Sequence, residues 1–424
     1  MEIKGKFNTA IVFAEIVDDF AIGQITELCC QEAFAGAKIR IMPDVHAGAG
    51  CTIGTTMTVT DRLVPNLVGV DIGCGMLAAN VTGDMDWEKL DSVIRAKVPC
   101  GFYVHDNGQK LPELDRLRCH DHVDINRAQK SIGTLGGGNH FIEVERKDDG
   151  SFMLVVHTGS RNLGKQAAEY YQGLAVQECA TGFADRNELV ETIKKKYAAA
   201  PAMIGEAIRQ MDKAAKHYKA RNLAYLDKTR GRGYGNYLND MEIIQRFAAA
   251  NRSAIAQTII NGMGWSAGEN FETIHNYIDM EDMILRKGAV SAKAGQKLLI
   301  PMNMRDGSLI CIGKGCSEWN FSAPHGAGRI MSRAQARARC SLQSFQESMG
   351  EVWTSTANIE TIDECPQAYK PVSAITNCIG DTVDTAGRGI PAYNFKAAEE
   401  PFFGRKIKKQ GEPLGEKCPR HNAV

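Results

Sequence analysis

Alternating apolar and polar positions, interrupted by glycine-rich turns, predict a series of short β-strands along this chain. In residues 39–60, β-branched side chains flank such a turn, which predicts two strands joined by a tight loop. Asp306 and Gly307 stand between two apolar runs and are typical of a hairpin turn. Further strand patterns cover residues 68–76, 139–145, 152–158, 271–278 and 297–301.

Other segments carry apolar residues at helical spacing. They predict an amphipathic helix over residues 84–98, a long charged helical stretch over 164–221 and a helix over 237–263. Apolar positions 330, 334, 338, 342 and 345 share one face, so we expect a helix to begin near Gly328 or Arg329. Strands and helices without a linker between them predict one large α+β domain over residues 1–424, with a helical insertion at 164–263.

The composition is typical of a globular protein. Hydrophobic residues make up 44% of the chain and charged residues 24%, and no apolar run approaches the length that crosses a bilayer. The N-terminus lacks the pattern of a secretory signal, and 13 cysteines without framework spacing indicate reduced thiols, so we expect a cytoplasmic protein. Because the formal net charge is zero, a nucleic acid would have to bind in a local basic groove.

Several turns carry side chains that bind metal ions. Asp71 and Cys74 lie three residues apart on a glycine-rich turn, so their carboxylate and thiolate could reach one cation. Taken separately, they would be an ordinary turn residue and a buried thiol. The strand pattern that ends at His157 is followed by Arg161, which suits metal and phosphate together. Residues 119–122, Cys-His-Asp-His, also resemble a metal cluster, but the absence of nearby glycines and buried strands favours a solvated loop.

Two further segments favour phosphate chemistry. The glycines at 136–138 lead into a strand with Asn139, His140 and Glu143, where bare backbone would let a phosphate or sugar approach; a strained bulge is the structural alternative. His325 precedes the predicted helix start, where backbone N–H groups attract anions. An imidazole there can be a base, a metal ligand or a nucleophile, or it can be hydrogen-bonded within a loop.

Basic residues gather in the predicted helical insertion and near the C-terminus. In the insertion they occupy positions 194–196, 209, 213, 216, 219 and 221. Such a surface could hold an RNA backbone, although charged helix faces are usually just solvated. Residues 397–424 form a basic C-terminal tail, which we interpret as an arm for RNA.

Taken in order along the chain, these motifs resemble the RtcB family of RNA-splicing ligases. The matching segments span nearly the whole chain and lie at 71–75, 136–143, 157–161, 275, 325–329 and 363–370. The resemblance implies mixed β-sheets around an active site that uses GTP and Mn²⁺ in RNA repair or tRNA splicing. It implies joining of RNA 2',3'-cyclic phosphate or 3'-phosphate ends to 5'-hydroxyl ends. The path would lead through a covalent histidine–GMP intermediate at His325 and an RNA-3'-pp-G intermediate.

The resemblance also implies roles for individual residues. Cys74 would bridge two Mn²⁺ ions, and the set of metal ligands would be Asp71, Cys74, His140, His157 and His275. Arg161 and Arg329 would clamp phosphates beside the catalytic His325, and Lys396 would bind the guanine nucleotide. The nucleotide contacts would be Asn139, His140, Phe141, Ile142, Glu143, His275, Asn276, Pro301, Met302, Asn303, Met304, Ser308, His325, Gly326, Ala327, Gly328 and Lys396.

Two segments depart from the family pattern. Ala49 stands where many relatives have a lysine, and residues 302–305 replace a Gly-Ser-Met-Gly loop, which bears on nucleotide geometry and leaves the metal ligands intact. Two alternative functions stay open: a dinuclear metallo-phosphoesterase that opens cyclic phosphates without ligation, and an inactive RNA-binding relative. As partners we expect RNA ends and GTP and no membrane; an activating protein is left open, and we expect a monomer.

Overall fold

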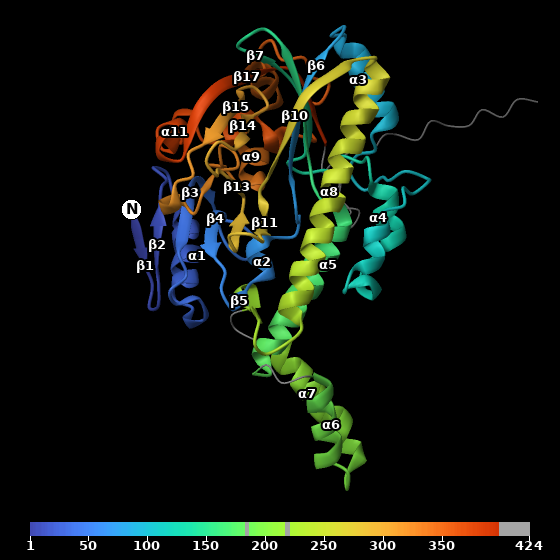
Figure 1. Cartoon of the computed structure of the whole chain (residues 1–424), viewed down its shortest axis with the longest axis vertical. Coiled ribbons are helices and arrows are strands. Elements are labelled where there is room, and N and C mark those ends of the chain that lie inside the picture. Colours follow the sequence, from blue (N-terminus) through green and yellow to red (C-terminus); the bar gives the residue numbers. More distant parts are fainter. Residues whose placement is uncertain (183–185, 217–220, 398–424) are drawn as a thin grey trace, which may run out of the picture.

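The computed structural model of the chain describes residues 1–182, 186–216 and 221–397. Helices surround two larger β-sheets, and one pair of helices projects from the body (Figure 1). Helices and sheets in a single body confirm the α+β prediction. Within the described ranges, every helix is too short or too polar to traverse a lipid bilayer.

Two sheets form the scaffold. One runs in the order β1 (Glu2–Lys4), β2 (Thr9–Val12), β3 (Ile39–His46), β4 (Ile53–Thr58), β12 (Ile284–Lys287), β11 (Asn276–Asp279). The other runs β10 (Ser266–Ile274), β6 (Gly75–Thr82), β8 (Phe152–Thr158), β7 (Phe141–Lys147), β17 (Val383–Lys396), β15 (Gly307–Gly313), β14 (Lys297–Asn303). Two short pairs are β13 (Ala289–Ser291) with β16 (Ser322–Pro324), and β5 (Arg62–Leu63) with β9 (Leu226–Asp227). Only β2 and β3 pair in parallel among these strands, so the first sheet is mixed and the second antiparallel.

The helices come from several parts of the chain. They are α1 (Asp19–Cys29), α2 (Pro65–Val68), α3 (Trp87–Lys97), α4 (Ile125–Ser131), α5 (Arg161–Ala180), α6 (Arg186–Lys196), α7 (Ile204–Lys216), α8 (Gly233–Met263), α9 (Arg333–Arg339), α10 (Leu342–Ser348) and α11 (Ser373–Thr376). The predicted helix over residues 84–98 is therefore α3. The predicted helix over 237–263 is α8, which begins four residues earlier than expected.

Helix α8 joins the core to the loops of the site. Its apolar residues recur at helical spacing and are buried, and the helix packs against α3, α5, β6 and β8. Two buried polar residues on it hold loop backbone. Asn251 accepts hydrogen bonds from the N–H groups of Gly133 and Thr134, and Arg252 donates to the carbonyl groups of Gly73 and Thr158. The turn before β6 and the end of β8 are thereby fixed relative to each other.

The prediction that a helix begins near residue 328 or 329 is wrong by about four residues, since α9 begins at Arg333. Arg329 forms an isolated β-bridge with Tyr369, and the residues on either side of it are bends or irregular, so no helix begins there. The helix begins only after Ser332, which forms a capping box with Gln335, and the predicted single face is divided between α9 and α10. The backbone next to His325 is therefore not a helix N-terminus, and the expectation of anion binding by a helix dipole does not apply to it.

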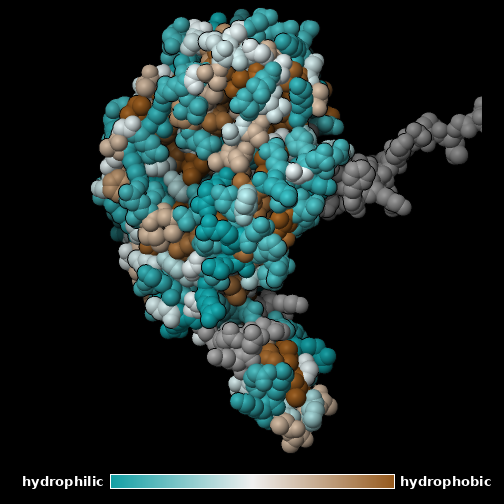
Figure 2. Space-filling view, turned by 45° about the vertical axis from the view of Figure 1, so that its right-hand side comes forward, coloured by the Kyte–Doolittle hydropathy of each residue, from teal (hydrophilic) through white to brown (hydrophobic). Residues whose placement is uncertain are grey.

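The described residues between 164 and 263 are mainly helical, with β9 as an exception. Helices α6 and α7 form the projection in Figure 1, and Figure 2 shows hydrophobic atoms on its surface. Met203, in the 3₁₀-turn between the two helices, is 53% exposed. Lys219 and the predicted tail beyond Ala397 lie outside the described residues. Contact between this insertion and RNA stays a prediction.

Replacing Gly307 by alanine is expected to destabilise the hairpin of β14 and β15, whose turn confirms the prediction at Asp306 and Gly307. Gly307 has a φ of +67°, and an added Cβ would overlap the Gly389 carbonyl group on β17. We expect the free energy of unfolding, measured in urea, to fall by roughly 2–5 kcal/mol. Gly295→Ala is the control, because Gly295 has a φ of +76° but open space around it, and should cost about 1 kcal/mol. Equal losses would contradict a steric cause.

Candidate active site and metal centre

The ends of neighbouring strands bring four of the predicted metal ligands together. They are Cys74 before β6, His140 before β7, His157 near the end of β8 and His275 between β10 and β11. In the ladder, Gly75 is paired with both Ile274 and Thr158, and Phe141 is paired with His157. Residues as far apart in the sequence as Cys74 and His275 therefore meet at one end of the adjacent strands β10, β6, β8 and β7 of the seven-stranded sheet.

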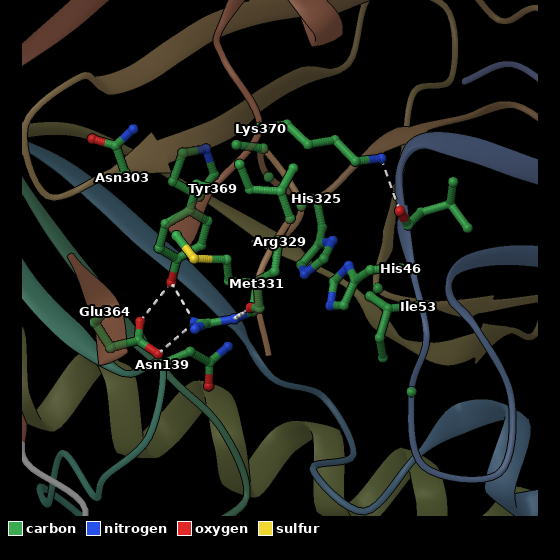
Figure 3. Close-up of a pocket in the computed structure, with 18 of the residues that line it drawn as sticks. His46, Ile53, Asn139, Asn303, His325, Arg329, Met331, Glu364, Tyr369 and Lys370 are labelled. Atoms are coloured by element: carbon green, nitrogen blue, oxygen red, sulfur yellow. Dashed lines mark hydrogen bonds and ion pairs between the residues drawn. The ribbon is translucent and has the colours of Figure 1, made fainter. Parts of the chain in front are cut away.

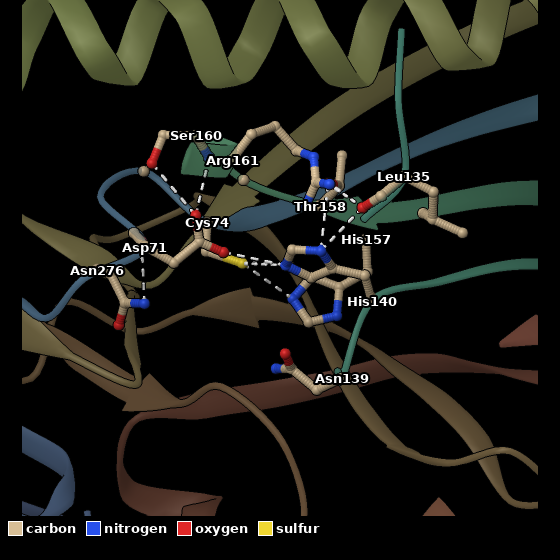
Figure 4. Close-up of polar contacts among 12 residues, drawn as sticks. Asp71, Cys74, Leu135, Asn139, His140, His157, Thr158, Ser160, Arg161 and Asn276 are labelled. Carbon is tan, nitrogen blue, oxygen red and sulfur yellow. Dashed lines mark hydrogen bonds and ion pairs between the residues drawn. The ribbon is translucent and has the colours of Figure 1, made fainter. Parts of the chain in front are cut away.

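The ligand atoms form two groups that share Cys74. One group is Cys74, His157 and His275, the other is Asp71, Cys74 and His140, and the ligand atoms in each lie within 4.8 Å of one another. The Cys74 Sγ is 3.5 Å from His140 Nε2 and 3.4 Å from His157 Nε2 (Figure 4). Neither group found among the described residues includes the run at 119–122. His120–His122 form an exposed turn of 3₁₀-helix, as the solvated-loop interpretation expected, whereas Cys119 is buried in the core, so the interpretation is wrong for that residue.

Hydrogen bonds around these groups leave acceptor atoms facing each other. His140 Nδ1 donates to the Leu135 carbonyl group at 2.9 Å, so its Nε2 keeps a lone pair, and this Nε2 lies 3.0 Å from Asp71 Oδ2. Two acceptors at that distance repel each other unless a cation lies with them. Within the described part of the chain, the Nδ1 atoms of His157 and His275 are buried without a hydrogen-bond partner. This donor set fits divalent metal ions.

Burial and neighbouring charges set the protonation of the ligands. Burial opposes ionisation of Asp71, but His140 and Cys74, when each carries a proton toward this carboxylate, donate hydrogen bonds that outweigh burial and lower the pKa of Asp71. Burial lowers the pKa of His157 and of His275 well below the ordinary value, so both imidazoles are neutral at pH 7. Burial, followed by the charge of Asp71, raises the pKa of Cys74 far above its usual range, so a metal ion must displace the thiol proton.

His325 shares a pocket of about 1050 Å³ with these ligands. The ring centroids of His275 and His325 are 4.8 Å apart. Many of the residues singled out in the sequence line this pocket: Asp71, Cys74, Asn139, Phe141, Glu143, His157, His275, Asn276, Pro301, Met302, Asn303, Met304, His325, Gly326, Ala327, Gly328, Arg329 and Lys396. Figure 3 labels four of them, Asn139, Asn303, His325 and Arg329.

Four of the predicted catalytic, nucleotide-binding and metal-binding residues do not line the pocket: His140, Ile142, Arg161 and Ser308. His140 contacts Cys74, while Ile142 is buried in the core beneath the seven-stranded sheet. The Ser308 hydroxyl donates to Glu145 at 2.6 Å. The side chain of Ile142 therefore points away from the pocket, while that of Ser308 is buried against Glu145. A nucleotide contact at these two positions stays a prediction. The fourth residue is Arg161.

The first glycine of the run at 136–138 makes room for Arg161. Gly136 has a φ of +86°, and a Cβ on it would overlap the Arg161 guanidinium. Arg161 donates from Nη2 to the Gly101 carbonyl group at 2.7 Å and from Nε to Thr134 Oγ1 at 3.2 Å. Close packing of Arg161 thus explains why residue 136 is a glycine. The sequence had suggested the approach of a phosphate or sugar, or a strained bulge. A phosphate-clamping role for Arg161 stays a prediction.

Asp44, which lies outside the predicted set of site residues, holds His325 in place. Its Oδ2 is 2.5 Å from His325 Nδ1 and accepts the His325 backbone N–H at 3.1 Å. Because a carboxylate only accepts, Nδ1 carries the hydrogen and Nε2 keeps the lone pair. His46 lines the same pocket beside His325 (Figure 3). Burial lowers the pKa of His46 to about 4, so it is neutral at pH 7. The alternation of Asp44 and His46 at a strand end was the signal that could have found them.

Glu364 is the second residue that the prediction missed. It is buried at the end of a 3₁₀-turn (Ile362–Glu364) and pairs with Lys396 at 2.7 Å, Arg329 at 3.1 Å and Arg333 at 2.6 Å. It also accepts a hydrogen bond from the Tyr369 hydroxyl at 2.6 Å (Figure 3). Lys396 in turn donates to the Asn139 carbonyl group at 3.1 Å. One carboxylate thus orders the cationic wall of the pocket.

Glu364→Gln is expected to destabilise the protein at neutral pH. Burial alone would raise the pKa of Glu364, but the charges of Lys396, Arg333 and Arg329 outweigh it and lower the pKa from 4.5 to about 2. This stabilisation is present above about pH 4.5 and is lost as the pH falls toward 2; its size is about 3 kcal/mol. Urea unfolding at pH 7 and pH 3 should show a difference between wild type and variant that shrinks in acid.

The exposed Glu360 nearby provides the control. Glu360→Gln should change the free energy of unfolding by less than about 0.5 kcal/mol at either pH. An equal difference in the free energy of unfolding between wild type and Glu364→Gln at pH 7 and at pH 3 would contradict an ionic cause.

Known proteins are similar to this chain over most of its length. The family model described as tRNA-splicing ligase RtcB matches residues 24–120 and 107–397. The RNA-splicing ligase RtcB of Escherichia coli (strain K12) is 30% identical over 392 residues, which cover 83% of this chain and 88% of that ligase. The tRNA-splicing ligases RtcB of Nanoarchaeum equitans and Aeropyrum pernix are each 25% identical, over 79% and 86% of this chain and 82% and 90% of their own.

The matched proteins carry the names of RNA-splicing or tRNA-splicing ligases, and the α+β fold with its cysteine and histidine ligand groups accords with that class. The chain belongs to the RtcB family, as the order of its motifs predicted.

Proposed function

We propose that this protein is a GTP-dependent RNA ligase that joins 2',3'-cyclic phosphate or 3'-phosphate ends to 5'-hydroxyl ends, in RNA repair or tRNA splicing. The observation that carries the proposal is one pocket lined by residues of two metal-ligand groups, Asp71, Cys74, His157 and His275, and by a histidine held by a buried carboxylate. Membership of the RtcB family supports RNA as the substrate. We also propose a cytoplasmic location, since Cys74 must stay reduced to bind metal. That the protein acts as a monomer stays a prediction.

The chemistry requires an activated end, because a 3'-phosphate lacks a good leaving group. In the first step, His325 Nε2 attacks the α-phosphorus of GTP, the bond to the β-phosphate breaks and pyrophosphate leaves. An oxygen of the RNA 3'-phosphate then attacks the same phosphorus and the P–N bond breaks, which yields RNA-3'-pp-G. Finally the 5'-hydroxyl oxygen attacks the RNA phosphorus and GMP leaves. A cyclic phosphate must first be opened by water.

The residues of the pocket wall would divide this work. Asp44 holds the Nδ1 hydrogen of His325, which aims the lone pair of Nε2 outward and stabilises the positive charge on the ring when the P–N bond forms. Lys396, fixed by Glu364, would bind the guanine nucleotide, and Arg329 on the same carboxylate would add positive charge near the phosphates.

Two Mn²⁺ ions held by Asp71, Cys74, His140, His157 and His275 would supply neutralisation of phosphate charge. Cysteine and histidine alone would favour zinc, whereas the Asp71 carboxylate together with phosphate oxygens suits manganese.

A gel assay with defined RNA ends tests the proposal. Joining should require a 3'-phosphate or cyclic phosphate, a 5'-hydroxyl, GTP and Mn²⁺, and a 5'-phosphate should not replace the hydroxyl. Opening of the cyclic phosphate without joining would instead identify a phosphoesterase. Binding of RNA without either reaction would identify an inactive relative. Joining that appears only with added cell extract would point to an activating protein.

A further inference from the structure

Strand β3 leaves its hydrogen-bonded ladder at the residues around Asp44. It pairs with β4 from Ile39 to Ile41 and again at His46, and the register shifts between these points. Its pairing with β2 also ends at Ile41. Pro43 in this gap has no backbone N–H and cannot continue a ladder. The buried carbonyl groups on either side of Asp44 therefore need partners from outside the sheet.

The ammonium group of Lys370 supplies those partners. Its Nζ donates to the carbonyl groups of Pro43 at 2.9 Å, Val45 at 2.8 Å and Ile16 at 2.8 Å. An ammonium group has three N–H donors and no acceptor, so these three bonds use it fully. Lys370 is only 3% exposed. Burial lowers the pKa of Lys370, and the negative charge of Asp44 counteracts that shift.

The same residue also holds the other side of the contact between Asp44 and His325. The backbone N–H of Lys370 donates to the Gly328 carbonyl group at 2.9 Å, three residues after His325. Lys370 thus fixes the backbone before and after Asp44 through its side chain, and the turn that carries His325 through its main chain. The hydrogen bond from His325 Nδ1 to Asp44 Oδ2, at 2.5 Å, joins these two fixed segments.

We propose that Lys370 is a positioning residue for the guanylylation of His325. By fixing the carbonyl groups on both sides of Asp44, it keeps the Asp44 carboxylate on His325 Nδ1 and so selects the tautomer whose Nε2 attacks. This inference rests on the proposed function, and Lys370 acts in it through Asp44.

The first test reads the tautomer without any nucleotide. In Lys370→Met a side chain of similar length lacks the three donors. Metal-free protein labelled with ¹⁵N-histidine, with His325 assigned by comparison with His325→Ala, should show a single Nδ1–H tautomer in the wild type. The Lys370→Met protein should show a mixture of tautomers. An unchanged His325 signal in Lys370→Met would overturn the inference, whatever the outcome for the ligase activity.

The second test reads the reaction. With labelled GTP, Lys370→Met should lower the rate constant of GMP transfer to the protein roughly 10- to 100-fold, while the half-saturating GTP concentration changes less than about 2-fold. Lys370→Arg should recover part of the rate, because it keeps donors and charge. In an Asp44→Asn background, Lys370→Met should lower the rate no further. A full additional loss in that background would overturn action through Asp44.

Lys287 offers a matched control. It is also a buried lysine, and its Nζ donates to the carbonyl groups of Ala49 and Asn66 at 2.7 and 2.9 Å. Lys287→Met should lower the free energy of unfolding about as much as Lys370→Met, yet leave the His325 tautomer unchanged. The same tautomer change in both variants would show a general loss of packing and would overturn the specific role of Lys370. If the wild type takes up no GMP at all, the proposed function fails, and the tautomer test still decides the role of Lys370.

Discussion

The His325→Ala variant is expected to take up no GMP while it keeps its fold and its metal ions. Alanine removes Nε2, the atom that forms the P–N bond, so the loss of acid-labile label from α-labelled GTP should be complete. The His325 side chain is 17% exposed, and its loss keeps the hydrogen bond from the backbone N–H to Asp44 Oδ2 but removes the one from Nδ1, which costs about 1–3 kcal/mol. Label on the washed protein, circular dichroism and manganese content are the three measurements.

His122 provides the control for this variant. It is an exposed histidine that stacks on Tyr170 outside the pocket, so His122→Ala should take up GMP as the wild type does. The chemistry makes a further distinction, because His325 takes part only before RNA-3'-pp-G exists. Supplied with RNA-3'-pp-G and a 5'-hydroxyl end, His325→Ala should still join them. A GMP adduct that survives in His325→Ala would refute the assignment of the nucleophile.

The Cys74→Ala variant is expected to lose both metal ions. The Cys74 Sγ belongs to both ligand groups, whereas His157 and His140 each belong to one. Removing one ligand weakens a metal site by at least about 10- to 100-fold, so Cys74→Ala should weaken both sites and His157→Ala only one. Elemental analysis after dialysis against micromolar manganese should give close to two ions for the wild type, one for His157→Ala and none for Cys74→Ala.

Cys311 is the matched control for the thiol. It is equally buried in β15, and burial raises the pKa of Cys311 to about 11, but it lies in a separate apolar cluster. Cys311→Ala should therefore bind manganese as the wild type does. An unchanged manganese content in Cys74→Ala would remove Cys74 from the metal site.

Local pattern alone was enough to predict several elements. The paired strands β3 and β4, the hairpin at Asp306 and Gly307 and the amphipathic helix α3 follow from alternation, turn residues and helical spacing, which act between neighbours in the chain. The order of the motifs also led to the family. Local pattern misplaced helix α9, because it cannot detect distant partners. The segment before this helix forms its backbone hydrogen bonds with residues around 369, far along the chain.

The sequence by itself determined which chemical groups this protein has and which strand ends carry them: a carboxylate, a thiol and several imidazoles beside glycine-rich turns. Only the tertiary structure decided which of these groups work together. Asp44 and His325 are 281 positions apart, and their contact depends on how two sheets and a lysine place their backbones. The reason is physical: periodicity reports burial along one element, whereas a hydrogen bond between distant side chains depends on the packing of every element between them.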